Sequence, residues 1–215
     1  MGADERTGLV VASAGTRRLA ALDDRPDVVI AADSGLHSVM AKGWVPDCVV
    51  GDMDSVDPET LAAAAHGGAV VERHAVTKDE TDLELALAAA LRFGVTDLLV
   101  VARGGGRLDH QFANLVVLAA PHLGSMRISA AIGDHRAWVV RGRRELDLSI
   151  GAHLALHPVG GSATVTTSGV AYPLARETLS PFAARGIANA VTEPPARIEV
   201  LDGVVLVVSS PPEPT

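Results

Sequence analysis

The sequence predicts an α/β protein, with an N-terminal open, mostly parallel sheet that has helices on both faces, followed by a small all-β sandwich domain. Three observations support this prediction. Over residues 1–134, short apolar runs alternate with longer amphipathic ones, as in sheets whose parallel strands are joined by helices. From residue 135 onward, helical periodicity fades and runs of near-alternating polarity replace it. The length of 215 residues is enough for two domains of these kinds.

Six runs in the first region are expected to be buried strands, because they are short, rich in Val and Ile, and bounded by Gly, Asp or Pro. They are Leu9–Ser13, Val28–Asp33, Cys48–Asp52, Val70–His74, Asp97–Ala102 and Ile128–Gly133. Five segments between them are expected to be helices, namely Thr16–Asp23, Leu36–Lys42, Pro58–His66, Asp79–Phe93 and His110–Ala120. Ligands of such sheets bind beyond the carboxyl ends of the strands, so functional residues are expected there.

The second region is expected to consist of strands. The runs are Arg136–Val140, His153–His157, Ala163–Thr167, Arg197–Leu201 and Val204–Val208. Asp202-Gly203 separates the last two runs, and its easy access to positive φ predicts a two-residue hairpin turn. The closing SSPPEPT has the composition of a disordered tail.

Composition excludes several functional classes. Lys and Arg number 18 against 26 Asp and Glu, and the net charge of −8 leaves no basic surface for nucleic acid. The single cysteine, Cys48, excludes an intrachain disulfide and a Cys-based zinc site, and favours a reducing compartment. The acidic N-terminus lacks the start of a signal peptide, and every apolar run is shorter than a membrane span. We expect a cytoplasmic protein with no nucleic-acid or membrane partner.

An acidic segment, Gly-Asp-Met-Asp-Ser at residues 51–55, follows the third predicted strand. In an extended segment, Asp52 and Asp54 point the same way and present two carboxylates to one site. Two adjacent like charges are unfavourable without a cation, and Mg2+ prefers carboxylate and phosphate oxygens. The alternative is a polar turn in which Ser55 or Asp57 caps the next helix.

A second acidic segment, residues 77–84 (TKDETDLE), opens the longest amphipathic helix. Thr77 and Glu80 have the spacing of a capping box, which would give some of these carboxylates a structural role. Capping does not account for Asp79 and Asp82, which are three apart on one face of the expected first turn. A second acidic pair after a second strand favours a metal site.

A glycine-rich segment, residues 102–110 (ARGGGRLDH), follows the fifth predicted strand. Its three glycines let backbone N–H groups approach an anion, and Arg107 adds a forked charge suited to phosphate. Asp109 is either a ligand contact or a helix N-cap, and His110 is either a ligand contact or a surface residue.

Asp33 closes the second predicted strand in a similar way, at Ala32-Asp33-Ser34-Gly35. An acidic residue there suits a ribose hydroxyl or the metal, and a helix N-cap is the alternative. The sequence contains neither G-x-G-x-x-G nor G-x-x-x-x-G-K-[ST], so the dinucleotide fingerprint and the P-loop are both excluded.

In chain order these segments resemble the motif series of the thiamine pyrophosphokinase family. The four segments are Ala32-Asp33-Ser34-Gly35, Gly51-Asp52-Met53-Asp54-Ser55, Lys78-Asp79-Glu80-Thr81-Asp82-Leu83-Glu84 and Gly105-Gly106-Arg107-Leu108-Asp109-His110. Residues 166–174 (TTSGVAYPL) resemble the family's T-T-x-G-L-x-[WY]-x-L strand, and residues 186–189 (GIAN) resemble its G-x-x-S-N element. Departures include Ser13-Ala14-Gly15, where the family often has paired glycines, Ala102-Arg103 at the entry to the glycine loop, and Ala188 in place of Ser.

The resemblance implies transfer of the diphosphoryl group of ATP to the hydroxyethyl group of thiamine, with release of AMP and Mg2+ as cofactor. It also implies a homodimer with thiamine sites at the subunit interface. Residues 1–134 would be the nucleotide-binding catalytic domain, and residues 135–215 the thiamine-binding domain.

The resemblance also implies roles for individual residues. Asp52, Asp54 and Asp82 would hold the metal, Asp79 would support them, and Arg107 would engage phosphate. The ATP side would further include Asp33, Ser34, Ser55, Lys78, Gly105, Gly106, Asp109 and His110. The thiamine side would include Ser168, Tyr172 and Asn189.

Tyr172 gives an independent indication of thiamine binding. The chain has only two Trp, one Tyr and three Phe, yet Tyr172 falls within a polar strand. A cationic planar substrate favours an aromatic face, and its aminopyrimidine needs a hydrogen-bonding partner such as Asn189 or Ser168. The alternative for Tyr172 is ordinary sandwich core.

Two other functions remain open from the sequence. One is a pyrophosphokinase for another heteroaromatic alcohol, such as a hydroxymethylpterin. The other is a non-catalytic module that senses nucleotide or thiamine.

Overall fold

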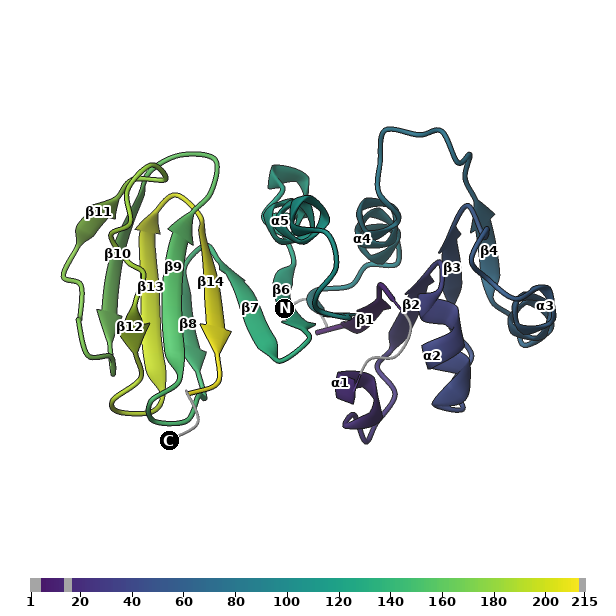
Figure 1. The fold of residues 1–215 in the computed structure, drawn as a ribbon, viewed down its shortest axis with the longest axis horizontal. Helices are drawn as coiled ribbons and strands as arrows, with labels where there is room; N and C mark the ends of the chain where they lie inside the picture. Colours follow the sequence, from purple (N-terminus) through teal and green to yellow (C-terminus); the bar gives the residue numbers. More distant parts are fainter. Residues whose placement is uncertain (1–4, 14–16, 213–215) are drawn as a thin grey trace. The chain divides into compact units, whose positions relative to one another are not determined.

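The computed structural model describes residues 5–13 and 17–212, and the chain divides into two compact units (Figure 1). The first unit comprises the residues up to 114 and residues 125–133, and the second comprises residues 115–124 and those from 134 onward. Ala14, Gly15 and Thr16, which belong to the first loop and the first predicted helix, lie outside the described residues, as do the last three residues of the tail.

The first unit contains a six-stranded parallel sheet in the order β6-β5-β1-β2-β3-β4. Its strands are β1 (Thr7–Val11), β2 (Val28–Ala32), β3 (Cys48–Gly51), β4 (Val70–Arg73), β5 (Asp97–Ala102) and β6 (Arg127–Ile132). All six predicted strands are therefore confirmed. The strand order reverses between β1 and β5, which is where ligands of such sheets bind.

Helices cover both faces of this sheet, as the fold prediction requires. The helices are α1 (Arg17–Ala20), α2 (Gly35–Ala41), α3 (Pro58–His66), α4 (Asp82–Arg92) and α5 (Leu108–Val117), the last of which ends in the second unit. A short 3-10 helix, η1 (Pro121–Leu123), belongs to the second unit. Leu19, Leu36 and Leu61 of the first three helices share one core with β1, β2 and β3. Figure 1 shows α4 on the opposite face. Its buried side chains, including Leu83 and Leu87, explain why this amphipathic segment is helical.

The start of α4 differs from the prediction. The helix begins at Asp82, and its capping box is formed by Thr81 and Glu84 instead of Thr77 and Glu80. Thr81 Oγ1 accepts from the backbone N–H of Glu84 at 3.2 Å, and Glu84 Oε2 accepts from that of Thr81 at 2.8 Å. Both pairs have the T-x-x-E spacing, but only the second immediately precedes the buried apolar face.

The second unit is a β-sandwich, as predicted, and Figure 1 shows its strands in colours from teal through green to yellow. Its strands are β7 (His135–Val140), β8 (Arg143–Leu146), β9 (His153–Pro158), β10 (Ala163–Ser168), β11 (Glu177–Leu179), β12 (Asn189–Ala190), β13 (Ala196–Asp202) and β14 (Val205–Ser210). One layer has the order β12-β9-β14-β7, and the other has β11-β10-β13-β8. Alternate residues of both layers enclose one apolar core, which includes Trp138, Leu156, Val165 and Ile198.

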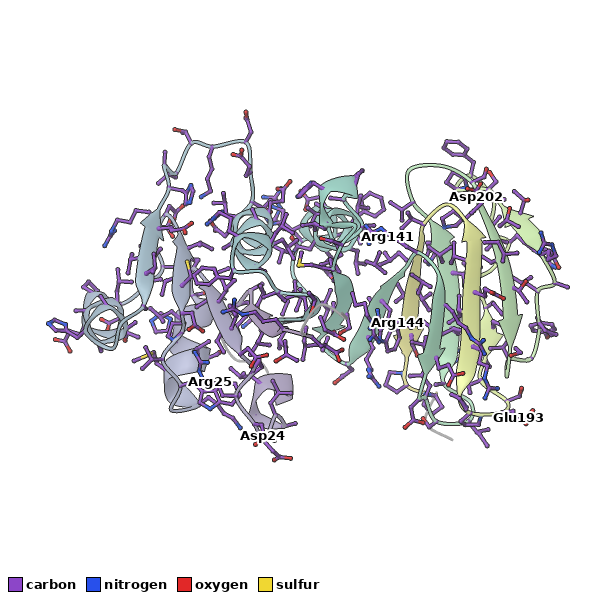
Figure 2. The ribbon with its side chains drawn as sticks, turned by 180° about the vertical axis from the view of Figure 1, so that it is seen from behind. Asp24, Arg25, Arg141, Arg144, Glu193 and Asp202 are labelled. Atoms are coloured by element: carbon purple, nitrogen blue, oxygen red, sulfur yellow. The ribbon has the colours of Figure 1, made fainter. Side chains whose placement is uncertain are left out.

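The hairpin predicted at Asp202-Gly203 is wrong. β13 and β14 are consecutive in the chain but belong to different layers, so the short link crosses from one layer to the other. The apolar residues of both strands nevertheless face one core, because Ile198 of β13 and Val207 of β14 belong to the same buried cluster. Gly203 has φ +85, and a Cβ on it would lie 2.6 Å from the carbonyl oxygen of Ser162, so this crossing requires glycine. Figure 2 labels Asp202 beside the link.

Residues 115–124 group with the second unit, although they precede the predicted boundary at residue 134. Arg141, labelled in Figure 2, donates from Nη2 to the carbonyl oxygens of Ala119 and Ala120 at 3.1 and 3.2 Å. The assignment of residues 1–134 and 135–215 to separate binding domains stays a prediction. In the described part of the chain, no helix is both long and apolar enough to cross a membrane.

Candidate functional site

Three aspartates meet at the carboxyl ends of β2 and β3. Asp33 follows β2, while Asp52 and Asp54 follow β3, and one carboxylate oxygen from each lies within 4.8 Å of the other two. The two strands are parallel neighbours, so their carboxyl ends share one edge of the sheet. The structure thus brings Asp52 and Asp54 together as predicted and adds Asp33 to them.

The geometry that pairs Asp52 with Asp54 is a turn and not the expected extended segment. Met53 between them has φ +66, and the backbone N–H of Asp54 donates to Asp52 Oδ1 at 3.0 Å. This local hydrogen bond is typical of aspartate in turns. Asp57 completes the loop as the N-cap of α3, where its Oδ2 accepts from the backbone N–H of Thr60 at 2.8 Å.

Asp33 is positioned by the loop that carries the other two aspartates. Ser55 Oγ donates to Asp33 Oδ2, so Ser55 acts here and does not cap α3. Gly51 has φ +143, and a Cβ on it would lie 3.2 Å from that of Asp33, so glycine permits this close approach. The N-cap of α2 is Ser34, without a side-chain bond, and the capping alternative for Asp33 is therefore wrong.

The three aspartates have the electrostatics of a cation site. The negative charge of Asp52 is the largest cause that raises the pKa of Asp54, and Asp33 and Asp82 raise it further. Within the described residues, Asp33 Oδ1 is buried without a hydrogen-bond partner. A buried carboxylate oxygen without a donor is costly unless something else satisfies it. This donor set of carboxylate oxygens fits a hard divalent cation such as Mg2+.

Asp82 lies close to the three aspartates but has a cationic partner of its own. Lys78 Nζ lies 2.9 Å from Asp82 Oδ1, and the two side chains are 13% and 33% exposed. The contact with Asp82 is the largest cause that raises the pKa of Lys78, and the charges of Asp52 and Asp33 add to it. Asp82 Oδ1 accepts no well-directed hydrogen bond from any described residue, so its contact with Lys78 Nζ is an ion pair without a hydrogen bond. Asp79 is exposed and precedes α4, so it does not share a helix face with Asp82.

The glycine loop after β5 forms a second part of the site, next to the point where the strand order reverses. Ser13, after β1, accepts a hydrogen bond on its Oγ from the backbone N–H of Arg103 at 2.6 Å. Gly105 and Gly106 have φ +84 and +87, which glycine adopts without strain. A cavity of about 290 Å³ lies here, lined by Ala102, Arg103, Gly105, Gly106, Arg107, His110, Gln111, Asn114 and Ile132.

Arg107 and Asp109 form an exposed pair at the rim of this cavity. Arg107 Nε donates to Asp109 Oδ1 at 3.1 Å, and this bonding lowers the pKa of Asp109 to about 2. Asp109 lies in the first turn of α5 and is not its N-cap. Gln111 and Asn114 line the cavity but were missed by the sequence analysis. Their spacing of four and seven from Arg107 was the available signal, because such residues share a helix face.

The predicted thiamine-side residues lie in the second unit. Tyr172 is 68% exposed, so the sandwich-core alternative is wrong. Asn189, in β12, is buried, and its side chain hydrogen-bonds to the main chain of Tyr172 and Ala190. Ser168 is exposed at the end of β10.

Comparison with known proteins gives matches to both units. A family model described as thiamin pyrophosphokinase, catalytic domain, matches residues 19–130, and one described as thiamin pyrophosphokinase, vitamin B1 binding domain, matches residues 142–205. A curated relative, thiamine pyrophosphokinase 1 of Oryza sativa subsp. japonica, is 28% identical over 201 residues, which cover 88% of this chain and 74% of the relative.

Solved structures resemble the whole fold. The thiamine pyrophosphokinase from Bacillus subtilis matches with a TM-score of 0.81 at 21% identity, covering 95% of this chain and 99% of that one. The thiamin pyrophosphokinase from Candida albicans matches with a TM-score of 0.75 at 14% identity, covering 97% of this chain and 90% of that one. At these identities the similarity shows the α/β-plus-sandwich fold.

Proposed function

The chain belongs to the thiamin pyrophosphokinase family, and from this premise we propose that it transfers the diphosphoryl group of ATP to the hydroxyethyl group of thiamine. The products are thiamine diphosphate and AMP. The observation that carries the proposal is the meeting of Asp33, Asp52 and Asp54 at the sheet edge, in a chain that also matches a vitamin B1 binding domain. A pterin pyrophosphokinase is not favoured, because the second unit matches a domain for thiamine.

The acidic cluster would hold Mg2+. Asp52 and Asp54 are proposed as ligands, together with Asp33, whose buried Oδ1 lacks a donor among the described residues. Asp82 is proposed as a further ligand, and Asp79 as a residue that supports the set. The bound ion would neutralise charge on the phosphate oxygens, which a cluster of carboxylates would otherwise repel.

The glycine loop would bind the ATP phosphates. Backbone N–H groups at Gly105 and Gly106 are accessible because no Cβ covers them, and the Arg107 guanidinium can bridge two phosphate oxygens. The cavity beside the loop would take part of the nucleotide, with His110, Gln111 and Asn114 as polar contacts. Ser34, Ser55, Lys78 and Asp109 complete the proposed ATP side.

The transfer itself needs positioning and charge neutralisation. The thiamine hydroxyl oxygen forms a bond to Pβ while the bond from Pβ to the oxygen shared with Pα breaks, and AMP leaves with that oxygen and its electron pair. The hydroxyl proton passes to solvent water in the same reaction. Arg107 would hold the charged oxygens of the transferred group, as cationic side chains do in other phosphoryl transfers.

Tyr172, Ser168 and Asn189 would form the thiamine side. The exposed ring of Tyr172 suits a cationic, planar ligand. We propose a homodimer whose thiamine sites lie at the subunit interface, as the family resemblance implies. A cytoplasmic location, expected from the single cysteine, stays a prediction.

Product stoichiometry tests the proposal. Purified protein is incubated with ATP, Mg2+ and either thiamine or a hydroxymethylpterin, and the nucleotide products are quantified. One AMP per thiamine consumed, with no ADP, is the expected result. ADP formation would contradict diphosphoryl transfer, AMP formation with the pterin alone would favour the other pyrophosphokinase, and ligand binding without turnover would favour a sensing module.

A further inference from the structure

Lys78 places a positive charge on Asp82, and the charges of Asp52 and Asp33 in the acidic cluster also act on it. The chain has only two lysines, and this one is mostly buried, with its Nζ 2.9 Å from Asp82 Oδ1. Burial of an ammonium group is unfavourable unless opposite charges compensate for lost hydration. Three carboxylates supply that compensation, namely Asp82, which Lys78 contacts, and Asp52 and Asp33, whose charges act on it.

The same contact occupies a carboxylate that is proposed to bind metal. Asp82 Oδ1 faces the lysine, while the oxygens of Asp33, Asp52 and Asp54 already lie within 4.8 Å of one another. A divalent cation beside these three would repel the Lys78 ammonium, because the charges of Asp52 and Asp33 already act on Lys78 and like charges repel in a partly buried site. The ammonium and the metal therefore compete for the negative charge of the same carboxylates.

We propose that Lys78 is a resident counterion, which holds the aspartates together before the metal binds and which the metal displaces from Asp82. The inference rests on the proposed metal site. As a counterion, Lys78 would lower the affinity of the site for metal, whereas a residue that merely orients Asp82 would raise it. A residue that orients a ligand would strengthen metal binding, whereas a counterion weakens it.

The test is metal binding by the whole protein without ATP or thiamine. Mn2+ serves as the probe, because free Mn2+ is measured directly by electron paramagnetic resonance, and Mg2+ is titrated in competition. Lys78→Met is expected to bind Mn2+ at least about tenfold more tightly than the wild type. Lys78→Arg keeps the charge and is expected to remain within about threefold of the wild type.

Lys42→Met is the matched control, because it removes the chain's other lysine. Lys42 Nζ contacts the carbonyl oxygen of Ala20 at 3.1 Å and lies over the ring of Trp44, and Lys42 is the C-cap of α2, at the helix end opposite to Asp33. Its Mn2+ affinity is expected to equal that of the wild type. If Lys42→Met also bound Mn2+ more tightly, the effect of Lys78→Met would be explained by the loss of any positive charge, which would contradict the proposal.

A double variant tests whether the competition passes through Asp82. Removing Lys78 in an Asp82→Asn background is expected to tighten Mn2+ binding by a smaller factor than in the wild type, because the shared carboxylate is neutral. Unchanged or weaker Mn2+ binding by folded Lys78→Met would overturn the counterion role and leave the metal site standing. No Mn2+ binding by any of the variants or by the wild type would overturn both proposals.

Discussion

The side-chain amide of Asn189 hydrogen-bonds to both main-chain groups of Tyr172. Asn189 Oδ1 accepts from the backbone N–H of Tyr172 at 3.0 Å, and Nδ2 donates to its carbonyl oxygen at 2.8 Å. Oδ1 also accepts from Ala190, so both of its lone pairs are used. Asn189 is 4% exposed beneath a tyrosine that is 68% exposed. Asn189 therefore positions Tyr172, and only its second N–H remains for a ligand.

Replacing Tyr172 should affect thiamine and spare ATP. Tyr172→Ala removes an exposed ring, so we expect the KM for thiamine to rise by about tenfold or more, with the KM for ATP unchanged. Tyr172→Phe keeps the ring and should remain within about threefold of the wild type. Steady-state kinetics with each substrate varied in turn measures both constants. An equal rise in the two KM values would argue against a thiamine-side role.

Neutralising the acidic cluster should abolish turnover without unfolding the protein. Asp52→Asn and Asp54→Asn keep the side-chain size and remove charge that would hold Mg2+, so kcat should fall by about 100-fold or more. Removing the repulsion that raises the pKa of Asp54 should leave the melting temperature unchanged or higher. Asp57→Ala, in the same loop, is the control. It loses the α3 cap at a cost of about 1 kcal/mol but should keep its kcat.

Arg107→Lys should impair catalysis although it conserves charge. A guanidinium bridges two phosphate oxygens, whereas an ammonium acts as a point charge, so we expect kcat/KM for ATP to fall by roughly 10- to 100-fold. The pair with Asp109 is exposed, so thermal stability should hardly change. Arg92→Lys disturbs a comparable exposed pair with Glu72 and should leave kcat/KM intact. Equal effects of the two substitutions would remove Arg107 from the phosphate site.

Loss of the capping box of α4 should lower the stability of the protein. Thr81→Ala removes the oxygen that accepts from Glu84, so the free energy of unfolding should fall by about 1 kcal/mol. Thr77→Ala changes a threonine with the same sequence spacing outside the helix and should have little effect. Urea denaturation of both variants measures the difference. A larger loss for Thr77→Ala would contradict the observed helix start.

Mixing two impaired variants tests the shared thiamine site. Asp54→Asn damages the acidic cluster and Tyr172→Ala the thiamine side, so both homodimers should have low activity at low thiamine. If each site takes one part from each subunit, a mixed dimer has one intact site, and activity should reappear after subunit exchange. Exchange demonstrated by differently labelled subunits, with no recovery of activity, would show that each chain builds its own site.

Periodicity and strand-end residues were sufficient to predict much of this protein from its sequence. The buried strands, the helices on both faces and the sandwich follow from local apolar patterns, which reflect which side of each element meets a core. The meeting of Asp52 and Asp54 beyond β3 was also predictable, because ligand-binding residues gather at the carboxyl ends of parallel strands.

Contacts between segments far apart in the chain decided the rest. Asp33 joins the other two aspartates because Ser55 and the glycine at residue 51 bring its loop close, and no local pattern specifies that approach. Strands β13 and β14 separate into different layers because their apolar faces meet across a core built by other strands. Local sequence sets the preference of each segment, whereas these pairings depend on packing and charge that exist only once the whole fold has formed.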